Sequence, residues 1–236
     1  MIKERKDAKT TIVAGILLTG LFAGMLVAYK SELETTSWDA KSQSDKNTTN
    51  STEENTTLSL EKKEIDISGL KKQYKLIVVN DQQIIVPDGN YISEKSEEID
   101  QRVTMFSDSN GKNSAETWLR TVDAIHEENP DGVILNGDMI DFFSEAKLNC
   151  LMTDLKRIKA PVLYNRADHD LGIWYSDTYT DEEVQQRENE SWDMEDVMVQ
   201  DFDEFLVVGI NNNTSQLSEA GLERLKEIWA EDKPIF

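Results

Sequence analysis

Short apolar runs alternate with amphipathic stretches over most of this 236-residue chain. The runs at 74–80, 132–135 and 162–164 are almost wholly apolar, which is typical of strands covered on both faces. Polar and acidic residues follow each run directly. We expect these residues to gather at the carboxyl ends of the strands, where open α/β sheets bind their ligands.

Apolar residues at helical spacing separate and follow these runs. Asn113 and Glu116 have the spacing of a capping box, which predicts the start of a helix. Helices are predicted at 97–106, 113–129, 145–158, 180–190 and 218–229, and further strands at 197–200, 205–210 and 233–236. Alternating strands and helices predict one α/β domain, residues 71–236, with βαβ crossovers.

Residues 10–29 carry no charge and are mostly apolar. A helix of about 20 residues is long enough to cross a hydrocarbon core of about 30 Å. The basic residues of segment 1–9 precede it and acidic residues follow it. The positive-inside rule therefore predicts a single-pass membrane anchor, a basic cytoplasmic tail and an extracytoplasmic domain. A cleaved signal peptide is the alternative, although its apolar core would be shorter.

Residues 30–70 are rich in Ser, Thr, Asn, Glu and Lys and show no apolar periodicity. Such a segment buries too little apolar surface to offset the entropy lost on ordering. The pattern predicts a disordered polar linker between the anchor and the domain.

Charge and rare residues limit the function classes. The formal net charge of −21 disfavours binding to nucleic acid, because an acidic surface repels phosphate backbones unless metals offset it. The one cysteine, Cys150, cannot form an internal disulfide and lies among leucines, so we expect a small buried core residue. His126 lies within a predicted helix and is expected to be structural or solvent-facing.

Chemistry-bearing side chains follow the three apolar runs. Carboxylates, an imidazole and an amide that meet at one sheet edge can hold two divalent cations. Helix capping and turn formation are the alternative roles for single acids in these positions. The candidates are Asp81 and Gln83 after the first run, Asp138 and Asp141 after the second, and Asp168 and His169 after the third.

Three motifs in this order resemble the calcineurin-like metallophosphoesterases. Residues 137–141 (GDMID) match the GDxxD motif of that family. Residues 81–83 (DQQ) match its first motif, usually D-x-H, in the D-x-Q form that some members use. Residues 167–170 (ADHD) occupy the place of G-N-H-[DE]. The resemblance covers 74–236 and implies a β-sandwich flanked by helices.

The resemblance also implies metal ligands. Asp81 and Gln83 would hold a first divalent ion, and Asp138 would bridge two ions. Asp168 stands where the family has an asparagine that binds the second ion and touches the phosphate. Oxygen ligands favour Mn, Fe or Mg, with Zn possible.

The implied reaction is hydrolysis of a phosphomonoester or phosphodiester by a metal-bound hydroxide. His169, oriented by Asp141, would act near the leaving group as a general acid or a stabiliser of the transition state. Arg166 could reach a phosphate oxygen or could be a surface charge.

The family supplies further histidines after the last helix, whereas this sequence ends at Phe236 and its only other histidine is His126. Two expectations stay open. The chain is a C-terminally incomplete part of a membrane-anchored hydrolase, or it is a catalytically inactive cell-surface module that retains the fold.

Overall fold

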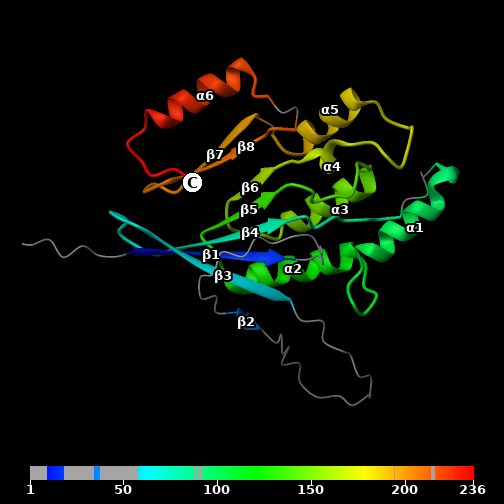
Figure 1. Cartoon of the computed structure of the whole chain (residues 1–236), viewed down its shortest axis with the longest axis horizontal. Coiled ribbons are helices and arrows are strands. Elements are labelled where there is room, and N and C mark those ends of the chain that lie inside the picture. The colour runs from blue at the N-terminus through cyan, green and yellow to red at the C-terminus, as the bar shows by residue number, and fades with distance from the viewer. Residues whose placement is uncertain are drawn as a thin grey trace, which may run out of the picture.

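The computed structural model describes residues 10–18, 35–37, 58–87, 89, 92–193, 195–213 and 216–236. Within these residues, a six-stranded sheet has the order β2-β3-β1-β4-β5-β6, and β7 pairs with β8 in a second sheet (Figure 1). The strands are β1 (Thr10–Leu18), β2 (Thr35–Ser37), β3 (Ser59–Ile67), β4 (Tyr74–Asn80), β5 (Gly132–Asn136), β6 (Val162–Asn165), β7 (Val197–Asp201) and β8 (Leu206–Ile210). The helices are η1 (Ser93–Lys95), α1 (Ser96–Met105), α2 (Ser114–Glu128), α3 (Glu145–Leu155), α4 (Asp168–Leu171), α5 (Asp181–Ser191) and α6 (Glu219–Trp229).

The three apolar runs form the parallel centre of the large sheet. Val79 of β4 lies beside Leu135 of β5, and Leu135 lies beside Tyr164 of β6. The carboxyl ends of these strands therefore meet at one edge, as the sequence predicts. Strands and helices alternate along this part of the chain, so the α/β prediction is confirmed.

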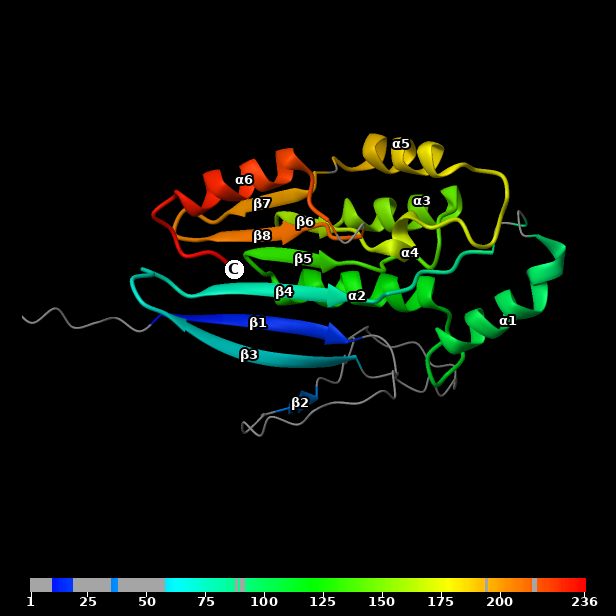
Figure 2. The same cartoon turned by 45° about the horizontal axis from the view of Figure 1, so that its top comes forward.

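Successive side chains of the strands point to opposite faces of each sheet, so the two sheets and the helices pack as layers (Figure 2). Ile77 and Val79 of β4 lie in a core with side chains of α2 and α3. Leu76 faces the other way and packs against the β7–β8 pair. The far side of β7 and β8 packs against α6. The result is a β-sandwich flanked by helices, as expected.

Aromatic rings fill the space between the two sheets. Phe202 and Phe205 stack with ring centroids 4.8 Å apart, and Tyr74 meets Phe205 edge-on at 4.9 Å. Gly132 at the start of β5 faces this cluster, and a Cβ atom there would overlap the ring of Phe202. Glycine therefore lets the two sheets approach closely.

The N-terminal apolar segment, for which the sequence predicts a helix over residues 10–29, forms strand β1 at Thr10–Leu18 in this structure. This strand runs parallel to β4 and antiparallel to β3. The segment begins with Thr10, Thr11, Ile12 and Val13, and β-branched residues suit a strand. Pairing also gives the backbone groups along that edge of β4 their partners. Among the described residues, no helix has both the length and the apolar character to cross a membrane. Residues 19–29 lie outside the described residues.

The prediction of a disordered linker across 30–70 is wrong for β3 and for the short β2. Leu58 and Leu60 pack against the main core, and Leu70 is buried. Charged residues dominate β3, so its sequence shows little of the apolar pattern of a strand. Main-chain pairing with β1 and β2 places it in the sheet. The remaining parts of 30–57 lie outside the described residues.

Other local predictions are confirmed. Asn113 accepts a hydrogen bond from the Glu116 amide at 3.0 Å, and the Glu116 side chain accepts from the Asn113 amide at 3.1 Å. His126 is exposed on α2. Cys150 is half-buried against the core rather than fully buried. Ile235 forms a parallel bridge with Leu206, so residues 233–236 begin a strand beside β8.

Candidate active site

Backbone hydrogen bonds join the loops that follow β4 and β5. The Asp81 amide donates to the Gly137 carbonyl at 3.2 Å, and the Gln83 amide donates to the Asp138 carbonyl at 2.9 Å. Asp81, Gln83 and Asp138 have φ values of 50°, 52° and 53°. This left-handed conformation is costly for residues other than glycine and is found preferentially at functional sites. The two loops are thus held together in an uncommon shape.

Gly137 is needed at the turn for two reasons. Its φ of 83° favours glycine. A Cβ atom at this position would also lie 2.6 Å from the Cβ of Ala167, in the loop after β6. The glycine therefore lets the second and third loops touch.

The buried carboxylate of Asp170 fixes the third loop to the second. It accepts backbone hydrogen bonds from Ala167 at 2.9 Å, Asp138 at 2.9 Å, Met139 at 2.8 Å and Ile140 at 3.0 Å. Burial raises the pKa of Asp170, and these backbone donors oppose the rise. The last acid of the ADHD motif therefore has a structural role: it holds the two loops together and fixes the position of the Asp138 backbone.

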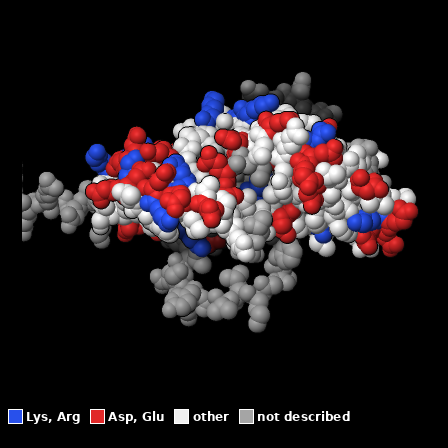
Figure 3. All heavy atoms as spheres, turned by 90° about the horizontal axis from the view of Figure 1, so that it is seen from above, with Lys and Arg blue, Asp and Glu red and all other residues white. Residues whose placement is uncertain are grey.

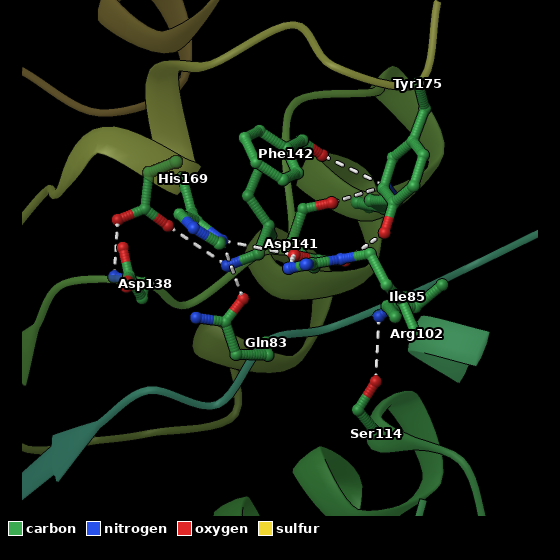
Figure 4. Close-up of polar contacts among 12 residues, drawn as sticks. Gln83, Ile85, Arg102, Ser114, Asp138, Asp141, Phe142, His169 and Tyr175 are labelled. Carbon is green, nitrogen blue, oxygen red and sulfur yellow. Dashed lines mark hydrogen bonds and ion pairs between the residues drawn. The ribbon is translucent and has the colours of Figure 1, made fainter. Parts of the chain in front are cut away.

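The carboxylate of Asp141 is fully buried, and both of its oxygens are satisfied (Figure 4). Arg102 donates from Nε to Oδ2 at 2.8 Å and from Nη2 to Oδ1. Tyr175 donates its hydroxyl to Oδ2, and His169 Nδ1 lies 3.1 Å from Oδ1. Burial alone would raise the pKa of Asp141, but these donors outweigh it and lower the pKa to about 2. A carboxylate has about four acceptor positions, so Asp141 has none left for a metal ion.

His169 is held through one ring nitrogen and one ring face. Its Nδ1 lies 3.1 Å from both Asp141 Oδ1 and Gln83 Oε1. Both oxygens are acceptors, so Nδ1 carries a proton and Nε2 is left for chemistry. Phe142 stacks on the imidazole with centroids 4.3 Å apart. The hydrogen bond to Asp141 raises the pKa of His169 against the effect of burial, and the charge of Asp138 adds to the rise.

Asp138 differs from Asp141 in its surroundings. Burial raises its pKa to about 6; the positive charge of His169 opposes the rise, and the nearby acids Asp170, Asp168 and Asp81 add to it. Its Oδ1 atom is buried and has no hydrogen-bond partner. An unsatisfied carboxylate oxygen among other acids is a position where a bound cation lowers the free energy.

The structure divides the predicted residues into two sets. Gln83, Asp138, Asp141 and His169 are buried or half-buried and lie close together. Asp81 and Asp168 are exposed but lie near enough to Asp138 for their charges to raise its pKa. Across the described parts of the chain, no three His, Cys, Asp or Glu side chains are arranged to hold a metal ion.

The oxygen atoms of the predicted ligands still suit a hard divalent cation. The main support is Asp138 Oδ1, which is buried and has no hydrogen-bond partner. The side-chain oxygen of Gln83 accepts a hydrogen bond from His169 Nδ1 in this structure. The amide group would have to rotate for this oxygen to bind a cation.

Arg166 fits neither role suggested by the sequence. It is 3% exposed, and its Nε donates to Glu188 Oε2 at 2.6 Å. Its Nη2 donates to the Trp192 carbonyl at 3.1 Å. The side chain turns inward from the end of β6 because a carboxylate of α5 pairs with it there, so Arg166 fastens α5 to the sheet and does not face the site.

The sequence analysis missed two residues that support the site, namely Arg102 and Lys147. Tyr175 follows the third motif as an aromatic residue that could line a pocket or only pack over the sheet, and the structure shows that its hydroxyl donates to Asp141. The fully buried Lys147 donates to the Asp141 carbonyl at 2.6 Å and to the Phe142 carbonyl at 3.1 Å. It thereby supports Phe142, whose φ of 56° is left-handed. Two signals were present in the sequence. Arg102 follows Ile99 by three residues, and Lys147 precedes Leu151 by four, so each charge lies on an apolar helix face.

The two-sheet fold and the acids at its carboxyl edge define a protein of the metallophosphoesterase class. A family model described as calcineurin-like phosphoesterase matches residues 101–235, and the chain belongs to this family. Such enzymes act on phosphoesters and generally use divalent metal ions. The matched span includes the second and third motifs and Arg102, and it begins after residues 81–83. No curated protein matches the chain in sequence.

Acid should weaken the fold through Asp141. Its pKa falls from 3.8 to about 2 on folding, so its contribution is complete above the unfolded pKa and is lost as the pH falls through the folded pKa. The contribution is about 2 kcal/mol. We measure the free energy of unfolding with urea at pH 5 and at pH 2. Its decrease between these two pH values should be about 2 kcal/mol larger in the wild type than in Asp141→Asn. Equal losses in the two proteins would contradict the assignment.

Proposed function

We propose that this protein is a metal-dependent hydrolase of phosphomonoesters or phosphodiesters. The observation that carries the proposal is the unequal state of the two acids in the GDMID motif. Asp138 has a buried oxygen without a hydrogen-bond partner, whereas Asp141 is saturated and holds His169. One acid is thus free for a cation, and the other is committed to orienting an imidazole.

The proposed cation ligands are Asp81, Gln83, Asp138 and Asp168. An all-oxygen set favours Mn, Mg or Fe, with Zn possible, and two ions are expected for this class. When bound, the ions would lower the pKa of a water molecule and offset negative charge. Such an offset is required here because the chain has a formal net charge of −21, and acidic side chains are spread over the face seen in Figure 3.

His169 is the proposed general acid. Its Nδ1 is directed to Asp141, which leaves Nε2 to give a proton to the oxygen of the departing alcohol. The raised pKa of His169, caused first by its hydrogen bond to Asp141, favours the protonated ring. Asp141 stabilises the positive ring, and Phe142 restricts its orientation.

A second candidate function is a non-catalytic module that retains the fold. One observation favours it. No three His, Cys, Asp or Glu side chains form a metal group among the described residues, and the only other histidine, His126, is exposed on α2. The second metal would then lack nitrogen ligands from this chain.

Activity and metal binding separate the two candidates. With Mn²⁺ and a chromogenic phosphodiester, we expect hydrolysis that Asp138→Asn abolishes and that the exposed control Asp232→Asn retains. Because Asp138 has a pKa of about 6, the affinity for Mn²⁺ should fall as the pH drops below 6, and binding there should release a proton. Calorimetry in two buffers measures both quantities.

The inactive module gives the opposite result. It would show no hydrolysis and no Mn²⁺ binding that depends on Asp138, even when the chain is extended beyond Phe236 with its natural coding sequence.

We also propose that residues 10–29 anchor the protein in a membrane, with segment 1–9 in the cytoplasm and the domain outside. The absence of charge in 10–29 and the basic residues before it support the anchor. An anchored helix and strand β1 use the same residues, so the two states exclude each other. In the anchored state β4 would lose its β1 partner.

Fractionation of cells that produce the full chain tests the anchor. We expect the protein to remain with membranes after alkaline carbonate extraction, and a chain that starts at residue 30 to lose this property. A C-terminal reporter that is active only outside the cytoplasm should be active. Recovery of the full chain in the soluble fraction would contradict the anchor.

A further inference from the structure

We infer that Arg102 of α1 is a positioning residue for the phosphoester reaction, acting through Asp141 to hold the imidazole of His169. The inference rests on the proposed function, since His169 is the proposed general acid. It concerns a residue outside all three sequence motifs.

The contact between Arg102 and Asp141 is bidentate, with two hydrogen bonds from the guanidinium to the two carboxylate oxygens. Nε meets Oδ2 at 2.8 Å, and Nη2 meets Oδ1. A planar guanidinium bound in this way fixes the plane of the carboxylate as well as its position. Asp141 Oδ1 is then directed at His169 Nδ1 at 3.1 Å. The orientation of the imidazole is therefore set by a residue that lies 39 positions earlier in the chain than Asp141.

Two further contacts complete the support. The Tyr175 hydroxyl donates to the same Asp141 oxygen as Arg102 Nε. Phe142 stacks on the imidazole, and the Arg102 guanidinium lies 5.3 Å from the Phe142 ring centroid. Of the side chains that hold His169, Asp141 and Phe142 are thus in contact with Arg102, and Figure 4 shows the bonds of Arg102 and His169 to Asp141.

The contribution of α1 to the stability of the fold does not explain the pairing of Arg102 with Asp141. Ile99 is the one fully buried residue of α1, so the helix contributes little to the core. Burying a charge pair seldom gains net stability, because desolvation offsets the attraction. The segment that leads into α1 is bonded to the chain around Tyr175: the Ile92 amide donates to the Tyr175 carbonyl at 2.9 Å, and Lys95 of η1 donates to the Trp174 carbonyl. The α1 segment therefore serves to deliver Arg102 to Asp141.

Nitrogen NMR tests the positioning in the metal-free full chain. The sequence has two histidines, so protein labelled with ¹⁵N-histidine gives one signal set for His169 and one for His126 as an internal reference. At alkaline pH we expect His169 to be in the Nδ1–H form in the wild type. Arg102→Gln should shift His169 toward a mixture of the two forms and leave His126 unchanged. Arg120→Gln is the control, because Arg120 has a similar side-chain exposure of 26% against 23% for Arg102 and pairs with Asp108.

Kinetics with Mn²⁺ give the second readout. Loss of a supporting partner of a catalytic group typically costs about 10- to 100-fold in activity. We expect kcat of Arg102→Gln to fall by that amount on phosphodiesters with a poor leaving group, and much less on a 4-nitrophenyl ester that needs little protonation. KM should stay within about threefold, since no substrate contact is lost.

The outcomes are distinct. Unchanged His169 signals in a folded Arg102→Gln protein overturn the inference, as does a kcat loss that is the same for all leaving groups. If the Gln variant does not fold, Arg102→Lys, which keeps the charge and loses the bidentate contact, is judged by the same two criteria. A wild type without hydrolytic activity refutes the proposed function, and the NMR result then still decides whether Arg102 positions His169.

Discussion

A carboxylate that is buried away from water loses stability for each acceptor position left without a hydrogen bond, and Asp141 fills its positions with donors from three parts of the chain. Arg102 comes from α1, His169 from α4 and Tyr175 from the segment beyond α4. Each donor must stay in place or the buried charge loses stabilisation. The geometry of the candidate site therefore depends on the satisfaction of one side chain.

A second buried acid joins the loops themselves. Asp170 accepts from four backbone amides across the second and third loops, and Gly137 permits their close approach at Ala167. With Asp141 and Asp170 both satisfied, Asp138 is left with a buried oxygen that has no partner. The contrast among these three acids, rather than their number, is what indicates a cation site. In GDMID the first acid, Asp138, is available, while Asp141 and the Asp170 of ADHD organise the site around it.

The sequence predicted the parts of this protein that depend on local patterns. The apolar runs, the Asn113 capping box and the acids at the strand ends could be recognised in the sequence. Hydrophobic periodicity, helix capping and motif spacing are all properties of short segments. Strands β1 and β3 were not predicted. An apolar run of about 20 residues fits either a membrane helix or a strand, and a charged outer strand shows little alternation. Arg102 was missed and Arg166 was misjudged for a related reason, since the carboxylate that pairs with each arginine is set by tertiary packing and lies far away in sequence.

The central claim is that a divalent cation binds at Asp138, next to His169. Titration of Mn²⁺ into protein labelled with ¹⁵N-histidine tests it most directly, because a paramagnetic ion broadens only nearby resonances. We expect the His169 signals to broaden at stoichiometric Mn²⁺, those of exposed His126 to persist, and Asp138→Asn to remove the effect. Broadening of both histidines alike, or of His169 equally in the Asp138→Asn protein, would contradict it.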